Sequence, residues 1–245
     1  GGILANSERP GEFIYDNLAI ETNVIEAARR VGVAKLVFLG SSCIYPKFAA
    51  QPMREEALLS GALEPTNEPY AVAKIAGLVM CRAYRRQYGC DFVSAMPTNL
   101  YGPGDNFDLR SSHVLPALIR KIDAAARSGA ETVEIWGSGT PRREFLHVDD
   151  LADGLVHLAK RYSGELHVNL GTGADLTIAE LAQTIARIVG FTGRFAYDAT
   201  KPDGTPRKLL DVSRMTALGW RARIPLEEGI RQAWTWYREN VAEAA

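Results

Sequence analysis

The chain has 245 residues, 47% hydrophobic and 23% charged, with a formal net charge of -1, an ordinary globular composition with no global field to attract nucleic acid or an anionic membrane. Its three cysteines, Cys43, Cys81 and Cys90, have no paired spacing, which argues against a secreted disulfide framework. No apolar run approaches the roughly 20 residues of a membrane span, so we expect a soluble, cytoplasmic protein without nucleic-acid or membrane partners.

The first half of the chain predicts a strand–helix–strand unit. Apolar residues recur at near-helical spacing over 12–31, and a short apolar run at 35–40 is typical of a buried strand. The alanine-rich segment 70–88 predicts a second helix, and 92–96 a second strand. A strand–helix–strand crossover implies a parallel sheet with helices on its faces, which is an α/β fold.

The second half alternates shorter elements. Thr177 with Glu180 three residues later has the pattern of a capping box at a helix start. The His147-Val148-Asp149-Asp150 run is explained by a strand that enters a helix capped by an aspartate, and we expect no metal site. The predicted elements are helices at 113–127, 177–189 and 226–241 and strands at 133–136, 144–148 and 167–171.

Tyr70 and Lys74 are the most informative pair of polar residues. Their i, i+4 spacing places both on one face of the second helix. A phenol has a pKa of about 10, and a nearby ammonium lowers it, so the pair can form a general acid. Ser41 and Ser42 follow the preceding strand, at the sheet edge where ligands of parallel sheets bind. For an isolated pair, chance is the commoner explanation, and the serines taken alone are better explained as strand caps.

The serine, tyrosine and lysine, in this order, resemble the proton-donating triad of the short-chain dehydrogenase/reductase superfamily. Longer strings resemble, over nearly the whole chain, the GDP-L-fucose synthase family within it. These strings are residues 39–47, 64–74, 96–103, 136–145 and 201–208.

The resemblance implies an α/β fold, with a Rossmann-type parallel sheet and a smaller α+β substrate domain. It implies epimerisation of GDP-4-keto-6-deoxy-mannose at C3 and C5, then reduction at C4 with NADPH to give GDP-fucose. Ser41, Tyr70 and Lys74 would form the triad, and Cys43 with His113 would move the C3 and C5 protons. Residues implied at the NADPH/NADP site are Leu39, Gly40, Ser41, Ser42, Tyr70, Lys74, Pro97, Thr98, Asn99, Leu100 and His113.

The resemblance also implies a site for the GDP-sugar in the second half. Basic side chains in Gly- and Pro-rich loops suit a diphosphate, and an indole can stack on a base. Taken singly, each of these residues is better explained as solvated surface charge, but that explanation is weaker for a cluster in loops. The implied substrate-binding residues are Lys121, Trp136, Arg143, Asp203 and Lys208.

The chain differs from the family pattern at the front of the cofactor domain. The Gly-rich phosphate turn that follows a first strand is absent, and Gly1-Gly2 does not replace it. We expect a partial Rossmann domain at 1–104 with 143–165, and a substrate domain at 105–142 with 166–245. Another nucleotide-sugar epimerase or dehydratase, or an inactive sugar-nucleotide-binding fragment, remains an alternative.

The resemblance finally implies a homodimer that pairs through the helices at 12–31 and 70–88. Both carry more apolar side chains than one sheet-facing stripe needs. The side chains expected at this interface are Ile14, Leu18, Ile20, Leu78, Met80 and Tyr84.

Overall fold

The computed structural model describes residues 3–201 and 203–242, so Gly1, Gly2, Pro202 and residues 243–245 lie outside it. Strands β1 and β2 pair in parallel, with Leu36 opposite Phe92, and helix α3 connects them. The predicted crossover is therefore confirmed. The elements of this half are α1 (Ile3–Glu8), α2 (Pro10–Arg30), β1 (Leu36–Leu39), α3 (Glu68–Tyr88) and β2 (Phe92–Pro97).

A third strand, β7 (Val168–Leu170), pairs in parallel with β2, giving the order β1-β2-β7. The expected domain division placed residues 166–245 outside the first domain. The β7 strand corrects this, because its backbone completes the ladder of β2. The rest of the division stays a prediction.

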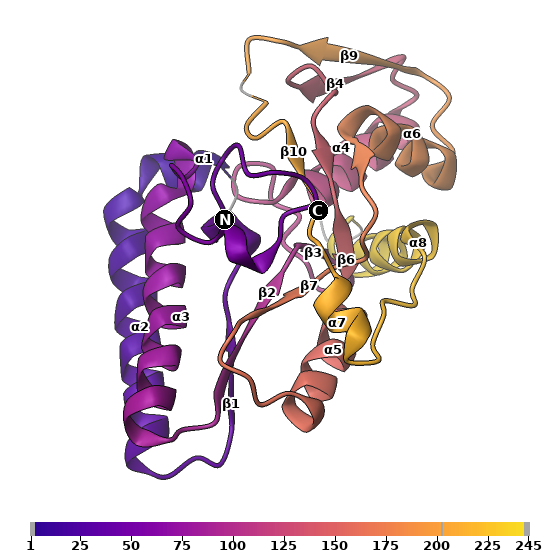
Figure 1. The fold of residues 1–245 in the computed structure, drawn as a ribbon. Coiled ribbons are helices and arrows are strands. Elements are labelled where there is room, and N and C mark those ends of the chain that lie inside the picture. The colour runs from indigo at the N-terminus through magenta and orange to yellow at the C-terminus, as the bar shows by residue number, and fades with distance from the viewer. Residues whose placement is uncertain (1–2, 202, 243–245) are drawn as a thin grey trace.

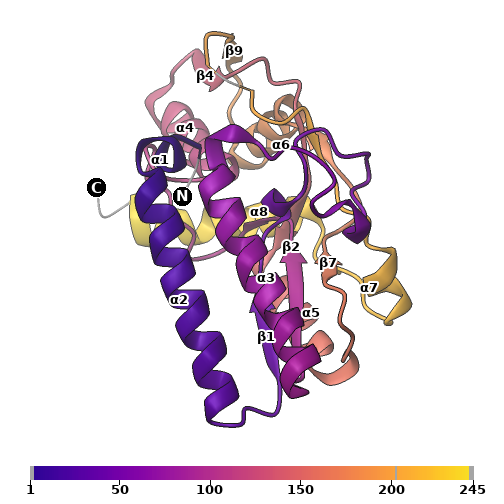
Figure 2. The same cartoon turned by 60° about the vertical axis from the view of Figure 1, so that its left-hand side comes forward.

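Helices cover both faces of this sheet. In Figures 1 and 2, α2 and α3 lie side by side along one face, and α5 (Val148–Arg161) lies on the other. On the first face, Ile25, Leu78 and Phe92 share one buried cluster. On the second face, Leu158 and Leu170 share another. The sheet is thus covered by apolar side chains on each side, as expected for parallel strands.

A second lobe is built around α4 (Val114–Ser128) and α6 (Ile178–Val189) and holds the largest buried cluster. The segment predicted as a helix at 226–241 ends as α8 at Tyr237 and continues as a π-helical turn, Arg238–Ala242. The remaining elements are β3 (Asn99–Tyr101), β4 (Thr132–Trp136), β5 (Arg142–Arg143), β6 (Phe145–His147), β8 (Leu176–Thr177), β9 (Arg194–Asp198), β10 (Arg207–Lys208), α7 (Ser213–Ala217) and α8 (Leu226–Tyr237).

The starts of helices α6 and α5 test two predictions made from the sequence. The capping box is confirmed: the Thr177 hydroxyl accepts from the Glu180 amide at 3.0 Å, and the Glu180 carboxylate accepts from the Thr177 amide at 2.7 Å. The aspartate cap of α5 is wrong. His147 is the N-cap, and its Nδ1 accepts from the Asp149 amide at 3.2 Å. Asp150 instead turns inward and accepts from the amide of Ile224 at 2.8 Å.

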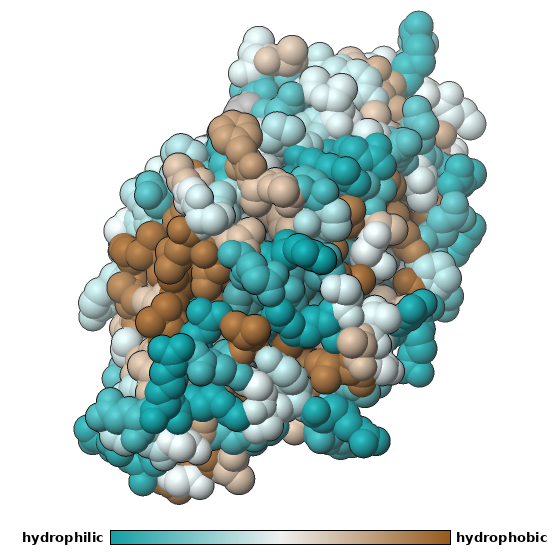
Figure 3. Space-filling model, viewed as in Figure 1, coloured by the Kyte–Doolittle hydropathy of each residue, from teal (hydrophilic) through white to brown (hydrophobic). Residues whose placement is uncertain are grey.

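The expected outer stripe of α2 and α3 is only partly correct. Ile20 is 63% exposed, as predicted, but the α3 side chains chosen pack into the core of the same chain. Val72 and Val79 are exposed on α3 instead. Figure 3 shows an apolar area over the upper part of α2 and α3. The residues whose expected exposure is wrong, being partly or fully covered, are Ile14, Leu18, Leu78, Met80 and Tyr84.

Among the described residues, no helix is both long enough and apolar enough to cross a bilayer.

Candidate functional site

The turn after β1 presents a hydroxyl and a thiol together. The chain leaves the strand at Gly40, where an added Cβ would lie 2.3 Å from the Met96 side chain, so only glycine fits easily. Ser41 is extended and caps a short 3-10 helix, with its Oγ accepting from the Cys43 amide at 3.4 Å. Cys43 is buried at 6% exposure. This turn therefore holds Ser41 and Cys43 in fixed relation.

Helix α3 brings Tyr70 and Lys74 to the same place, as predicted. The Lys74 Nζ lies 5.6 Å from the centre of the Tyr70 ring. The expected lowering of the Tyr70 pKa is wrong: burial raises it, as do the charges of Cys43 and Glu21, and the Ser41 hydroxyl opposes the shift. Lys74 is paired with Glu21 at 2.7 Å, so its charge is largely neutralised. We name Ser41, Cys43, Tyr70 and Lys74 the Ser41 cluster.

The charge of Lys208 acts on both Cys43 and His113. Burial raises the pKa of the Cys43 thiol, and the Lys208 ammonium opposes this shift. His113 is the exposed N-cap of α4, where partial desolvation of the ring lowers its pKa and the charge of Lys208 adds a smaller contribution in the same direction. Around neutral pH the pair therefore holds a protonated thiol and a neutral imidazole. The structure thus places both expected proton-transfer groups within the field of Lys208.

Lys208 and Arg143 are opposite residues of the parallel pair β10 and β5. Desolvation lowers the pKa of both side chains. The Arg143 Nη2 donates to the Asp203 carbonyl at 3.2 Å. The Asp203 carboxylate accepts from the Ser138 amide at 2.7 Å and from its hydroxyl at 2.8 Å. Asp203 therefore ties together the two loops that carry the basic side chains.

Trp136, at the end of β4, is 50% exposed and lies close to two cations. The Nζ of Lys121 is 5.1 Å from the centre of one indole ring, and that of Lys201 is 5.4 Å away. An exposed indole flanked by ammonium groups can stack on a planar ligand while the cations meet phosphates. We name the set Lys121, Trp136, Arg143, Lys201, Asp203 and Lys208 the basic region.

The expected cofactor residues lie at the carboxyl ends of β1 and β2. Leu39 is 41% exposed, although it ends a strand of the sheet, which fits an apolar ring resting on it. Pro97 ends β2 and is buried, whereas Leu100 is partly buried. The side chains of Thr98 and Asn99 donate to the Glu144 carbonyl at 3.3 and 2.8 Å. Ser42 is buried in the 3-10 helix. The open apolar end of β1 beside a hydroxyl and an ammonium fits a nicotinamide cofactor.

Sequence reasoning missed three residues of these sites. Glu21 lies on the core face of α2 with Ile25 and Ala28, so a carboxylate in an apolar stripe was an available signal. Glu144 is fully buried and accepts from the amides of Thr172 and Gly173 at 2.6 and 2.7 Å. Lys201, the second cation at Trp136, had no distinct signal.

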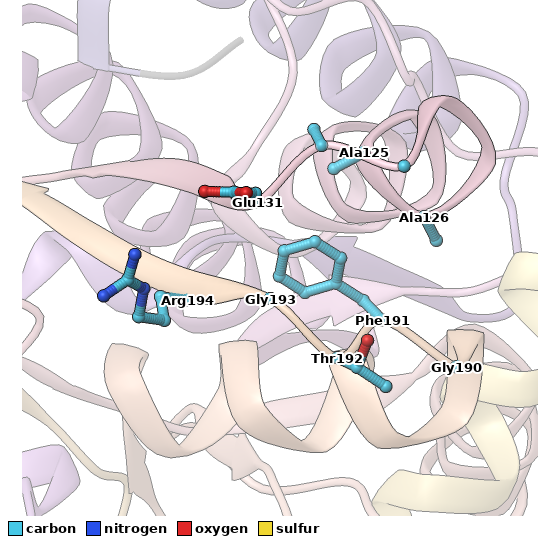
Figure 4. Close-up of a pocket in the computed structure, with 10 residues that line it drawn as sticks. Ala125, Ala126, Glu131, Gly190, Phe191, Thr192, Gly193 and Arg194 are labelled. Carbon is cyan, nitrogen blue, oxygen red and sulfur yellow. The ribbon is translucent and has the colours of Figure 1, made fainter.

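A pocket elsewhere in the second lobe is not this site. Figure 4 shows it between the end of α4 and the turn after α6, with Phe191 inside and mostly small residues around it. Its ionisable groups are Glu131 and Arg194, and none of the Ser41 cluster lines it. Among the described residues, no three His, Cys, Asp or Glu side chains are grouped to hold a metal ion.

Comparisons with known proteins agree with this geometry. The chain is 59% identical to probable GDP-L-fucose synthase 1 of Oryza sativa subsp. japonica, covering 100% of this chain and 75% of that one. It is 56% identical to GDP-L-fucose synthase of Escherichia coli (strain K12), covering 98% and 78%. A GDP-L-fucose synthetase structure from Naegleria fowleri bound to NADP has a TM-score of 0.89, 32% identity, and coverage of 96% and 75%. Residues 1–171 match the NAD dependent epimerase/dehydratase family. The chain belongs to this family.

Proposed function

We propose that this protein converts GDP-4-keto-6-deoxy-D-mannose to GDP-L-fucose, by epimerisation at C3 and C5 followed by NADPH-dependent reduction at C4. The observation that carries the proposal is the position of Cys43, two residues from Ser41 and in the field of the same Lys208 that acts on His113. A reductase alone needs only Ser41, Tyr70 and Lys74. The added thiol and imidazole supply proton transfer at carbon.

Epimerisation uses the acidity of protons next to a ketone. Removing the proton at C3 or C5 puts negative charge on the C4 oxygen, and a proton returned to the opposite face inverts the centre. Cys43 and His113 together hold one labile proton and one free basic position, which is the balance that one removal and one return require. The hydroxyls of Ser41 and Tyr70 donate to the enolate oxygen and lower its energy.

Reduction then uses the same donors. NADPH, when bound, supplies a hydride to C4. Tyr70 gives its phenolic proton to the C4 oxygen, and the Ser41 hydroxyl holds that oxygen in place. A raised Tyr70 pKa suits this role, because the phenol stays protonated until the oxygen becomes basic. Tyr70 and Lys74 would also hold the nicotinamide riboside, with Leu39 and Leu100 beside it.

The basic region would hold the GDP part of the substrate. Arg143 and Lys208 present two cations from adjacent strands, which suits a diphosphate. Trp136, flanked by Lys121 and Lys201, offers a face for a ring. Because Lys208 acts on both Cys43 and Arg143, a diphosphate bound here would bring the attached sugar to the Ser41 cluster.

We also propose a homodimer through α2 and α3. Val72, Ala76, Val79 and Ala83 form an exposed stripe on α3, and α2 carries a matching one with Ile20 and Val24. Two such pairs would form a four-helix contact and cover the apolar area of Figure 3. Sedimentation at micromolar concentration distinguishes this dimer from a monomer. We place the protein in the cytoplasm, since its three cysteines are free.

The test is an assay of the protein expressed from its complete gene. GDP-4-keto-6-deoxy-D-mannose and NADPH should give GDP-L-fucose with one NADPH oxidised per product. Reduction without inversion at C3 and C5 would favour a plain nucleotide-sugar reductase. Binding of the sugar nucleotide without turnover would favour an inactive binding protein.

A further inference from the structure

Lys74 of the Ser41 cluster has a partner that the proposed chemistry does not yet use. Glu21 comes from α2, the helix beside α3 in Figure 2, and is only 5% exposed. Its Oε1 lies 2.7 Å from the Lys74 Nζ. Ile25 and Ala28 follow on the same buried face of α2. A carboxylate is thus inserted into an apolar helix interface and aimed at the active lysine.

The helix interface leaves space for this carboxylate at Gly77. A Cβ at Gly77 would lie 2.8 Å from the Glu21 Oε2 and 2.4 Å from Cζ of Phe38. Glycine is disfavoured inside a helix, and Gly77 lies in the interior of α3. The Lys74 ammonium also lies 5.4 Å from the centre of the Phe38 ring. Glu21 and Phe38 therefore both lie close to the ammonium, and the missing side chain at Gly77 leaves the space that they occupy.

The charge of Glu21 acts on three groups of α3, which are Lys74, Tyr70 and Cys81. Burial raises the pKa of Glu21, and Lys74 opposes this shift. The Glu21 carboxylate in turn raises the pKa of Tyr70 and of Cys81. On the β1 side the neighbour is the uncharged ring of Phe38. The carboxylate thus acts on the proton donor as well as on the lysine.

We propose that Glu21 is a positioning residue that fixes the Lys74 ammonium beside the Tyr70 ring and so prepares Tyr70 to act as the acid at C4. The inference rests on the proposed reduction. A buried ion pair adds little stability compared with apolar packing, so stability alone does not explain it well. Without Glu21, Lys74 would lose its anchor, and its positive charge would act on Tyr70 without compensation.

The first test needs no cofactor or substrate. Lys74 in the protein is acylated with an amine reagent, and the rate is followed by mass spectrometry of the peptide that contains it. In Glu21→Gln we expect labelling to be about tenfold faster, because no carboxylate then holds the Lys74 amine in the helix interface, away from the reagent. The matched control is Glu26→Gln. Glu26 lies on the same helix, and its carboxylate accepts from the Tyr84 hydroxyl of α3 at 2.8 Å. Glu26→Gln therefore changes a similar contact between α2 and α3, but one away from Lys74.

The second test separates positioning from a structural role by kinetics. For Glu21→Gln we expect kcat of reduction to fall about tenfold, part of what a general acid contributes, with KM for the keto-sugar unchanged. The loss of activity at alkaline pH should begin at lower pH, since the Tyr70 phenol loses its proton more readily without the carboxylate. Glu26→Gln should match the wild type in kcat and in its alkaline limb.

Wild-type labelling, kcat and alkaline limb in a folded Glu21→Gln variant would overturn the inference. If this variant does not fold, Glu21→Asp replaces it, because shortening the side chain withdraws the carboxylate from its 2.7 Å contact. It should label faster and turn over more slowly, and wild-type values would again overturn the inference. Failure of the proposed function itself is distinct, because the wild-type protein would then not oxidise NADPH with the keto-sugar.

Discussion

The Ser41 cluster and the basic region use opposite environments. Cys43 is buried, and Tyr70 is partly buried. Trp136, by contrast, is half-exposed, and Asp203 and Lys201 lie at the surface. Burial shifts the pKa of Cys43 and Tyr70 away from their usual values. Reactivity is therefore set by burial in the first region, whereas the second combines exposed groups with the partly buried cations Arg143 and Lys208.

Lys208 joins the two regions. It stands beside Arg143 in the basic region, yet its charge opposes the effect of burial on Cys43. The comparison thus predicts that changes in the Ser41 cluster alter rate constants. Changes in the basic region should alter binding, and Lys208 should alter both.

The largest effect is expected from Tyr70→Phe. Loss of the phenolic proton should lower the reduction rate by roughly 10²–10⁴-fold, the usual contribution of a general acid, with the fold unchanged. NADPH oxidation in the presence of the keto-sugar measures it. Tyr88→Phe, a half-exposed tyrosine at the end of the same helix, is the matched control. Near-normal activity in Tyr70→Phe would remove Tyr70 from the mechanism.

A comparable but more selective loss is expected from Cys43→Ser. A serine hydroxyl is a far weaker acid than a thiol, so exchange of the C3 and C5 protons with D2O should slow by about 100-fold. NMR of the sugar measures this exchange, and reduced products should retain the original configuration. Cys90→Ser, a partly exposed cysteine outside the cluster, should exchange normally. Normal exchange in Cys43→Ser would mean that this thiol only fills space.

A smaller effect is expected in the basic region. Arg143→Gln should raise KM for the GDP-sugar about tenfold, the value of one lost charge-assisted contact, and leave kcat nearly unchanged. The wild-type KM should rise with salt, and that of the variant should rise less, because one charge is gone. Lys160→Gln, an exposed lysine on α5, is the control. A fall in kcat at constant KM would contradict the division between the regions.

The smallest change is expected for Lys208→Met and concerns pH. The Lys208 charge lowers the pKa of Cys43, so its removal should raise that pKa. The pH at which C3 and C5 exchange reaches half its maximum should therefore move up by about one pH unit. Lys201→Met, which removes a cation that faces Trp136, should weaken binding without this shift. An unchanged pH profile in Lys208→Met would mean that Lys208 does not act on Cys43 and so does not join the two regions.

Sequence alone could predict most of the first lobe. The helical spacing of apolar residues in α2 and α3, and the polar residues after β1, are local sequence patterns, and the folded chain keeps them. The two-residue strands β5 and β10 have no such pattern, because each exists only through its partner. The Glu21–Lys74 contact joins residues 53 positions apart, and the raised pKa of Tyr70 depends mainly on burial, which is a property of the folded chain. Local spacing therefore predicted that Tyr70 and Lys74 lie close together, but it predicted the wrong direction for the Tyr70 pKa.

The central claim is that one enclosed cluster moves protons at carbon independently of hydride transfer. The most direct measurement is proton exchange in D2O with NADP⁺, which has no hydride to give, in place of NADPH. Wild-type protein should introduce deuterium at both C3 and C5 of GDP-4-keto-6-deoxy-D-mannose while C4 stays unreduced. The absence of deuterium at both carbons, from a protein that still reduces the sugar with NADPH, would contradict the account.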